Sequence, residues 1–158
     1  DYKKSYSAKK KGGGGVLLDL SHEIDYVQWL CGNMEEIKSY QVRISDLEIT
    51  SDDLTMLIGK TNKNVFVNIS IDYISKLTHR RVVVETFQNS YELDFITSKL
   101  VKRNKLGLEE VYSFASLERN TMFEKMHLDI LNKQKTICTF EEGLKVMNTI
   151  CTIQEQNR

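Results

Sequence analysis

The spacing of apolar residues predicts a helix over residues 15–31. Five apolar residues recur there at intervals of three and four, which places them on one helical face. They are Leu17, Leu20, Ile24, Val27 and Cys31. A run of four glycines, residues 12–15, starts this helix, and Gly32-Asn33 is a typical helix stop. Residues 1–11 are polar without a clear period, so we expect a lead-in loop.

Beyond residue 33 the pattern changes to the alternation that is typical of strands. A strand is predicted over residues 38–44 and a loop over 46–51. Two hairpins follow, one over 54–59 and 65–73 around the turn Thr-Asn-Lys-Asn, and one over 81–87 and 91–95 around Gln-Asn-Ser. Residues 98–113 fit neither period cleanly and are left unassigned.

Helical spacing returns near the carboxyl end, over residues 117–132 and 139–156. Thr139 precedes Glu142 by three residues, the pattern of a capping box. The order is thus one helix, about five strands and two helices. This order predicts an α+β fold with an open, mainly antiparallel sheet and helices packed on one face. The 158 residues are expected to form a single domain.

Composition excludes several classes of function. The chain has 22 basic and 22 acidic residues, so broad electrostatic binding to nucleic acid or to an anionic membrane is disfavoured. No apolar run approaches the roughly 20 residues that a membrane span needs. The three cysteines form no Cys-x-x-Cys pair and the three histidines lack zinc-site spacing. We therefore expect reduced thiols, a cytoplasmic location and no metal site.

The glycine run invites comparison with phosphate-binding loops. A Walker loop has its lysine after the glycines and follows a strand, whereas here the lysines come first. The dinucleotide fingerprint also fails, because Leu17 stands where its third glycine is needed. Two interpretations remain open: a simple hinge, or a close approach of a ligand or another backbone to the helix entrance.

A polar stripe accompanies the apolar face of the first predicted helix. Asp19, His22 and Asp25 are spaced at three-residue intervals, which places them on one side of a continuous helix. A carboxylate beside an imidazole is a common arrangement for general acid–base catalysis. An ordinary solvated helix face has the same spacing, and spacing alone favours that interpretation.

The stretch GGGG-VLLDLSHEIDYVQWLCG closely resembles the signature helix of the glucose–fructose oxidoreductase, inositol dehydrogenase and rhizopine catabolism (Gfo/Idh/MocA) family. The positions with counterparts in the family pattern are Gly13, Gly14, Gly15, Asp19, His22, Asp25, Trp29 and Gly32. The preceding DYKKSYSA, the two hairpins and the two closing helices resemble family segments in the same order. The family spaces its aspartate and histidine four positions apart, whereas here the interval is three.

The resemblance implies that this chain is the C-terminal domain of a longer enzyme. Family members carry an N-terminal Rossmann domain that binds the nicotinamide cofactor and supplies a catalytic lysine in a Glu-Lys-Pro motif. This chain has no proline and no dinucleotide fingerprint. NAD or NADP is therefore expected on the other domain, with no cofactor bound by this chain alone, which is expected to be inactive.

The resemblance also assigns roles to individual residues. His22 is expected to accept the proton of a substrate hydroxyl, and Asp19 to orient His22 or the substrate. Asp25 and the preceding Lys3, Lys4 and Tyr6 are expected to contact substrate, although a solvated loop explains the last three equally well. Gly13, Gly14 and Gly15 are expected to let substrate and cofactor approach. The short basic cluster of Lys76, His79, Arg80 and Arg81 is interpreted as a solvated turn rather than a phosphate site.

The implied function is an NAD(P)-dependent oxidoreductase that acts on the hydroxyl of a sugar, nucleotide sugar or polyol. The implied partner is a second copy, since the open sheet face needs a cover. The alternative is a non-catalytic, dimeric binding or assembly module on the same domain. Nucleic-acid binding through the lysine-rich start is a weaker third interpretation.

Overall fold

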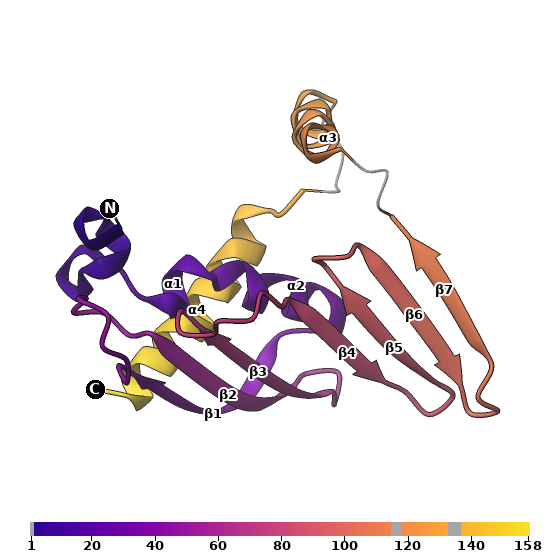
Figure 1. The fold of residues 1–158 in the computed structure, drawn as a ribbon, viewed down its shortest axis with the longest axis horizontal. Coiled ribbons are helices and arrows are strands. Elements are labelled where there is room, and N and C mark those ends of the chain that lie inside the picture. Colours follow the sequence, from indigo (N-terminus) through magenta and orange to yellow (C-terminus); the bar gives the residue numbers. More distant parts are fainter. Residues whose placement is uncertain (1, 115–117, 133–136) are drawn as a thin grey trace. The chain divides into compact units, whose positions relative to one another are not determined.

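The computed structural model describes residues 2–114, 118–132 and 137–158. The chain divides into two compact units, which are considered separately. The first unit comprises Asp1–Ser75 with Cys138–Arg158, and the second comprises Lys76–Ile137 (Figure 1). The prediction of a single domain over residues 1–158 stays a prediction.

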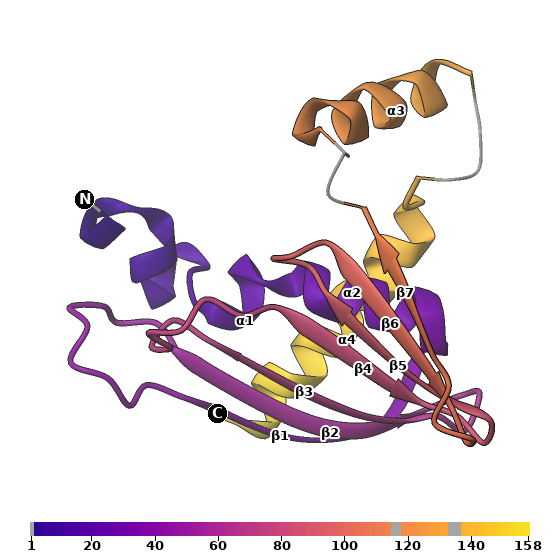
Figure 2. The ribbon, with the colours of Figure 1, turned by 45° about the vertical axis from the view of Figure 1, so that its right-hand side comes forward.

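The first unit is a three-stranded antiparallel sheet covered by helices. Strands β1 (Met34–Val42), β2 (Leu54–Thr61) and β3 (Phe66–Asp72) pair in the order β1-β2-β3. Helices α1 (Val16–Asp19), α2 (Ser21–Cys31) and α4 (Phe140–Gln156) lie on one face of this sheet (Figure 2). The lead-in forms three short 3-10 turns at Tyr2–Lys4, Tyr6–Ala8 and Lys10–Gly12.

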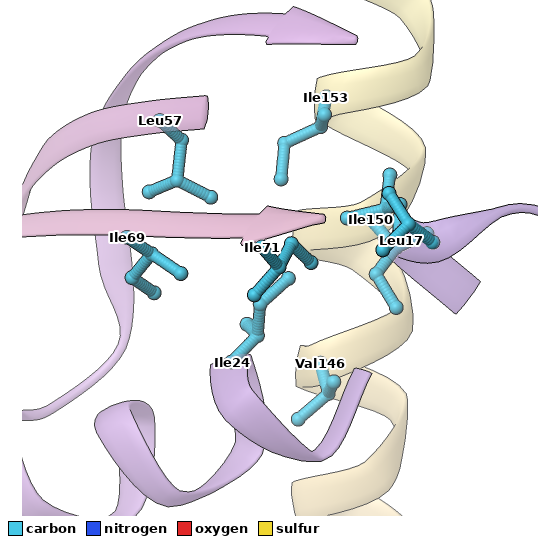
Figure 3. Packing of buried hydrophobic residues seen from close by; sticks show 9 residues of the cluster. Leu17, Ile24, Leu57, Ile69, Ile71, Val146, Ile150 and Ile153 are labelled. Atoms are coloured by element: carbon cyan, nitrogen blue, oxygen red, sulfur yellow. The ribbon is translucent and has the colours of Figure 1, made fainter. Parts of the chain in front are cut away.

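The hydrophobic core of this unit lies between the sheet and the three helices. Each helix and the two strands β2 and β3 contribute buried side chains (Figure 3). The members are Val16, Leu17, Ile24, Leu57, Ile69, Ile71, Val146, Ile150 and Ile153. Polar contacts add to this packing: Thr149 of α4 donates a hydrogen bond to Gln28 of α2, and Gln156 of α4 donates to the Ile37 carbonyl of β1.

Strand register gives the sheet two different faces. Leu57 lies opposite Ile69 and both are buried beneath the helices. The neighbouring positions point the other way, so the helix-free face carries exposed apolar side chains. These are Tyr40, Met56, Ile58 and Phe66, which we call the open face.

The second unit is a four-stranded antiparallel meander with one helix. Strands β4 (Arg81–Glu85), β5 (Asn89–Asp94), β6 (Lys99–Asn104) and β7 (Glu109–Ser113) pair in chain order, and α3 spans Arg119–Leu131. Ion pairs join β6 to β7, with Lys102 contacting Glu110 at 3.0 Å and Arg103 contacting Glu109. Such exposed cross-strand pairs favour this register, although each contributes little stability.

The α+β class with open antiparallel sheets is confirmed, and both predicted hairpins form. The strands divide between two sheets rather than one, and there are seven in the described ranges rather than five. The unassigned segment 98–113 forms β6 and β7, joined by a turn in which Gly107 has φ +80°. Helix α3 occupies most of the predicted 117–132 segment, whose first residue lies outside the described residues.

The predicted helix over 15–31 is wrong in one respect, because it is interrupted at Leu20. This residue has φ −106° and ψ 26°, outside the helical range, so α1 ends at Asp19 and α2 begins at Ser21. The capping box at the start of α4 is confirmed: Thr139 accepts from the Glu142 amide, and the Glu142 carboxylate accepts from the Thr139 amide.

The glycine run lies against the protein's own backbone and side chains. A Cβ added at Gly14 would stand 2.2 Å from the Tyr6 carbonyl oxygen and 2.4 Å from that of Ser7. A Cβ at Gly15, where φ is +128°, would stand 2.1 Å from Oδ1 of Asp52. Glycine is therefore needed at both positions for the lead-in and the Asp52 loop to approach the entrance of α1.

None of the helices in the described ranges is long and apolar enough to cross a bilayer.

Truncating the core at Ile150 is expected to destabilise the protein strongly. Ile150 is fully buried, so Ile150→Ala leaves a cavity and lowers the free energy of unfolding by about 2–5 kcal/mol. Leu144→Ala on the same helix is the control, because Leu144 is 49% exposed and its truncation costs little. Urea denaturation of both variants measures the difference, and equal losses would contradict the core described above.

Adding a methyl group at Gly14 is expected to destabilise the entrance of α1. Gly14→Ala forces a side chain against two backbone carbonyls, at a cost of about 1–3 kcal/mol. Gly12→Ala is the matched control, since a Cβ there meets its nearest atom at 3.6 Å. Thermal unfolding that leaves the two alanine variants equally stable would show that the lead-in does not pack as described.

Candidate functional site

Helix α1 begins on the side chain and backbone of Asp52. The Val16 amide donates to the Asp52 carbonyl at 3.1 Å, and the Leu17 amide donates to its Oδ2 at 3.2 Å. These two bonds satisfy amide groups that a helix start leaves without intrahelical partners. Because Val16 and Leu17 are fully buried, the bonds also hold the start of α1 in the core.

Asp19 is held by a tyrosine from the end of β3. The Tyr73 hydroxyl donates to Oδ2 of Asp19 at 2.5 Å, while Oδ1 is buried and has no hydrogen-bond partner in the described part of the chain. Burial, and then the hydrogen bond to Asp19, raise the pKa of Tyr73 far above its ordinary value. Tyr73 is therefore a permanent hydrogen-bond donor to this carboxylate.

His22 lies on the other side of the break, in the first turn of α2. Its side chain is 51% exposed, and Nε2 lies 3.1 Å from Oε1 of Glu23. The Glu23 carboxylate is nearly buried and also accepts a 2.5 Å hydrogen bond from the Tyr26 hydroxyl. His22 thus presents a half-exposed imidazole, a side chain that commonly accepts and donates protons, with a carboxylate beside its Nε2.

The structure gives Asp19 and His22 separate partners. Asp19 pairs with Tyr73, whereas His22 pairs with Glu23. The expected alignment of the two side chains assumed one continuous helix, and the non-helical backbone of Leu20 changes their relative direction. The prediction that Asp19 orients His22 stays a prediction, and so does its alternative, that Asp19 orients substrate.

Asp25, the third member of the predicted stripe, faces the start of α4. Cys138 Sγ lies 3.9 Å from Asp25 Oδ1, a weak thiol–carboxylate hydrogen bond. Burial, followed by the charges of Asp25 and Glu142, raises the pKa of the Cys138 thiol, so it is a poor nucleophile at neutral pH. The expected contact of Asp25 with substrate stays a prediction.

The other predicted substrate contacts lie in the lead-in. Lys3 Nζ binds Glu48 at 2.6 Å, and this contact lowers the pKa of the Glu48 carboxyl. Lys4 is exposed in the same 3-10 turn, and Tyr6 is 64% exposed in the next. A Cβ added at Gly13 would meet no atom within 4 Å, whereas one added at Gly14 or Gly15 would collide with the protein's own atoms.

The basic cluster near residue 80 is part of the second unit, where its two arginines contact other side chains. Arg81 contacts Glu92 at 3.5 Å and Asp94 at 3.6 Å. The Arg80 guanidinium stacks over the ring of Phe95, 4.5 Å from its centroid. These contacts agree with the interpretation of the cluster as a structural turn rather than a phosphate site.

Three residues of the candidate site were not singled out by sequence analysis for it. Glu23 and Asp52 carried no motif, and Tyr73 was only the last residue of the predicted strand over 65–73. Only Glu23 had a usable signal, because it adjoins His22. In the described ranges, no group of three or more His, Cys, Asp or Glu side chains could hold a metal ion.

Comparison with known proteins identifies the fold. Residues 1–92, more than half of the chain, match the profile of the GFO/IDH/MocA C-terminal domain. A search of curated proteins finds no significant sequence match.

Several solved structures share the fold. They include an NAD binding oxidoreductase from Klebsiella pneumoniae, with a TM-score of 0.82, 14% identity and coverage of 96% of this chain and 51% of that one. UDP-N-acetylglucosamine 3-dehydrogenase GnnA from Acidithiobacillus ferrooxidans has a TM-score of 0.76 and 14% identity, with coverage of 90% and 46%. A super-repressor mutant of Gal80p from Saccharomyces cerevisiae has a TM-score of 0.75 and 17% identity, with coverage of 96% and 50%.

This chain spans about half the length of these structures. At such low identity, similarity to these structures establishes only the fold. The family profile matches the sequence itself, and the matched segment contains Asp19, His22 and Asp25. The chain belongs to the GFO/IDH/MocA C-terminal domain family, a family of oxidoreductase domains.

Proposed function

We propose that this domain forms the substrate side of an NAD(P)-dependent oxidoreductase that acts on the hydroxyl of a sugar, nucleotide sugar or polyol. The observation that carries the proposal is the half-exposed His22 imidazole with its nearly buried Glu23 partner, inside the segment that matches the family. This pair provides a proton acceptor that solvent-borne substrates can reach.

The glycine run does not fit a cofactor pyrophosphate. The space that Gly14 and Gly15 leave is taken by the carbonyls of Tyr6 and Ser7 and by the Asp52 carboxylate, and a carboxylate repels phosphate. A nicotinamide cofactor would therefore be held by another domain of a longer protein, and the isolated chain is expected to be inactive.

The proposed chemistry is the oxidation of a secondary alcohol, or its reverse. The hydroxyl proton passes to Nδ1 of His22 as the carbon–oxygen bond becomes double, while Nε2 carries its hydrogen beside the Glu23 carboxylate. A nicotinamide cofactor held by another domain would supply the acceptor for the hydride that leaves the same carbon.

The substrate class has two supports. One solved relative is a UDP-N-acetylglucosamine 3-dehydrogenase, and another is an aldose-aldose oxidoreductase from Caulobacter crescentus in complex with glycerol. In this chain, the exposed Lys4 and Tyr6 provide hydrogen-bonding groups in the lead-in, as a polyhydroxylated substrate requires. The free thiols of Cys31, Cys138 and Cys151 fit the proposed cytoplasmic location.

Replacing His22 in the full-length enzyme tests the proposed function. His22→Asn removes the proton acceptor, so turnover is expected to fall by about 10²–10⁴-fold. His127→Asn, a change at an exposed position of α3, is the control and is expected to leave turnover unchanged. Nicotinamide absorbance with a panel of sugars and polyols measures both, and equal turnover in the two variants would contradict the role of His22.

A homodimer through the open face is the proposed assembly. Four apolar side chains are exposed there: Tyr40, Met56, Ile58 and Phe66. A solvent-exposed apolar patch on a sheet is typical of an interaction surface. The same exposed patch also supports the second candidate, a non-catalytic assembly module. One of the solved structures with this fold is a super-repressor mutant of Gal80p.

Placing a charge on the open face tests the dimer. Ile58→Glu puts a carboxylate at a position that is 59% exposed in the single chain, so the fold is preserved. Burying this charge in a dimer interface would cost free energy and weaken the dimer. Analytical ultracentrifugation is expected to show a dimer for the wild type and a monomer for this variant. Leu144→Glu, on the helical side, is expected to remain dimeric. A wild type that is monomeric at high concentration would contradict the proposal.

A further inference from the structure

We propose that Tyr26 is a positioning residue, which acts through the Glu23 carboxylate to keep Nδ1 of His22 available as the proton acceptor. This inference rests on the proposed function and deepens it, because it names the group that orients the proposed acceptor. It also gives a task to a tyrosine hydroxyl that lies outside both the apolar core and the predicted polar stripe.

The three side chains project from one end of a helix that is anchored in its unit. His22, Glu23 and Tyr26 lie in the first two turns of α2. Ile24 and Gln28 of the same helix are almost fully buried. Because these buried residues hold the helix in place, the side chains at its start have a rigid base, as a precisely oriented group needs.

The Glu23 carboxylate has a different partner on each oxygen. Oε2 accepts a 2.5 Å hydrogen bond from the Tyr26 hydroxyl, three residues further along the helix, and Oε1 lies 3.1 Å from Nε2 of His22. The Glu23 side chain is only 11% exposed, so water has little access to replace either partner. The hydrogen bond to one oxygen restricts the rotation of the carboxylate, and it thereby directs the other oxygen at the imidazole.

This contact determines which nitrogen of the neutral imidazole is the acceptor. A carboxylate accepts hydrogen bonds and cannot donate one, so Nε2 carries the hydrogen beside Glu23 and Nδ1 is left as the acceptor. The side chain of His22 is 51% exposed, so a substrate hydroxyl can reach the ring from solvent. When the hydroxyl proton passes to Nδ1, both nitrogens carry hydrogen and the contact of Nε2 with Glu23 is kept.

Loss of the Tyr26 hydroxyl is therefore expected to affect His22 without any contact between Tyr26 and substrate. The nearly buried carboxylate loses a hydrogen-bond donor and is free to rotate away from the imidazole. The imidazole then exchanges between its two tautomers, and in the second one Nδ1 carries the hydrogen and cannot accept a proton. A tyrosine that only stabilised α2 would lower the stability of the protein and leave the tautomer of His22 unchanged.

The first experiment observes the tautomer directly and needs no activity. Nitrogen NMR of isotope-labelled histidine rings, at a pH where the imidazole is neutral, distinguishes a ring nitrogen that carries hydrogen from one that does not. In the wild type, His22 is expected to hold its hydrogen on Nε2, whereas Tyr26→Phe and Glu23→Ala are expected to give a mixture of both tautomers. His127 of α3 is the internal reference and is expected to be the same in all three proteins. A hydrogen on Nδ1 of His22 in the wild type, or an unchanged tautomer in both variants, would overturn the proposal.

The second experiment tests the positioning role in the full-length enzyme. Tyr26→Phe is expected to lower kcat by about 10–100-fold, as loss of an orienting partner does, with little change in KM because the hydroxyl does not touch substrate. In a Glu23→Ala background the same change is expected to have little further effect, since Tyr26 acts through Glu23. The matched control is Tyr112→Phe, which removes an exposed tyrosine–carboxylate hydrogen bond to Glu110 and is expected to leave kcat unchanged.

The outcomes separate this inference from the proposed function. If the full-length enzyme oxidises sugars or polyols and depends on His22, but Tyr26→Phe has wild-type kcat, the positioning role is wrong and the proposed function stands. The same holds if Tyr26→Phe lowers kcat as much without Glu23 as with it. If the full-length enzyme has no oxidoreductase activity, or keeps it in His22→Asn, both the inference and the proposed role of His22 fall.

Discussion

The first unit depends on one close approach, that of the Asp52 carboxylate to Gly15. Only glycine leaves room for this carboxylate, and only glycine adopts the φ of +128° there without strain. The approach lets Asp52 receive the first amides of α1, and it thereby fixes Val16 and Leu17 in the core. The glycine run serves the packing of the protein itself, which explains why flexible residues directly precede a buried helix.

Helix α1 ends after one turn at Asp19, and α2 begins at Ser21. The break at Leu20 leaves Asp19 beside β3, in contact with Tyr73, and places His22 at the start of α2 with a half-exposed imidazole. Two groups that the sequence assigns to one stripe therefore have different surroundings. The carboxylate and the half-exposed imidazole therefore have separate partners, Tyr73 and Glu23.

Local patterns in the sequence predict the parts of this fold that local interactions determine. The capping box at Thr139 and both hairpins depend on residues close in sequence, and they form, although the second turn lies at Thr86–Asn89 rather than at Gln88-Asn89-Ser90. The Leu17–Asp52 and Asp19–Tyr73 hydrogen bonds join residues 35 and 54 positions apart, so no periodicity reveals them. Strands β6 and β7 were left unassigned because charged residues stand next to one another in both, which hides the alternation on which strand prediction relies.

A structure of the full-length enzyme with nicotinamide cofactor and a bound sugar would test the central claim most directly. The reactive hydroxyl is expected to lie about 2.6–3.2 Å from Nδ1 of His22, with Nε2 still beside the Glu23 carboxylate. A sugar bound away from α2, with the His22 imidazole in solvent, would contradict the proposed role of His22.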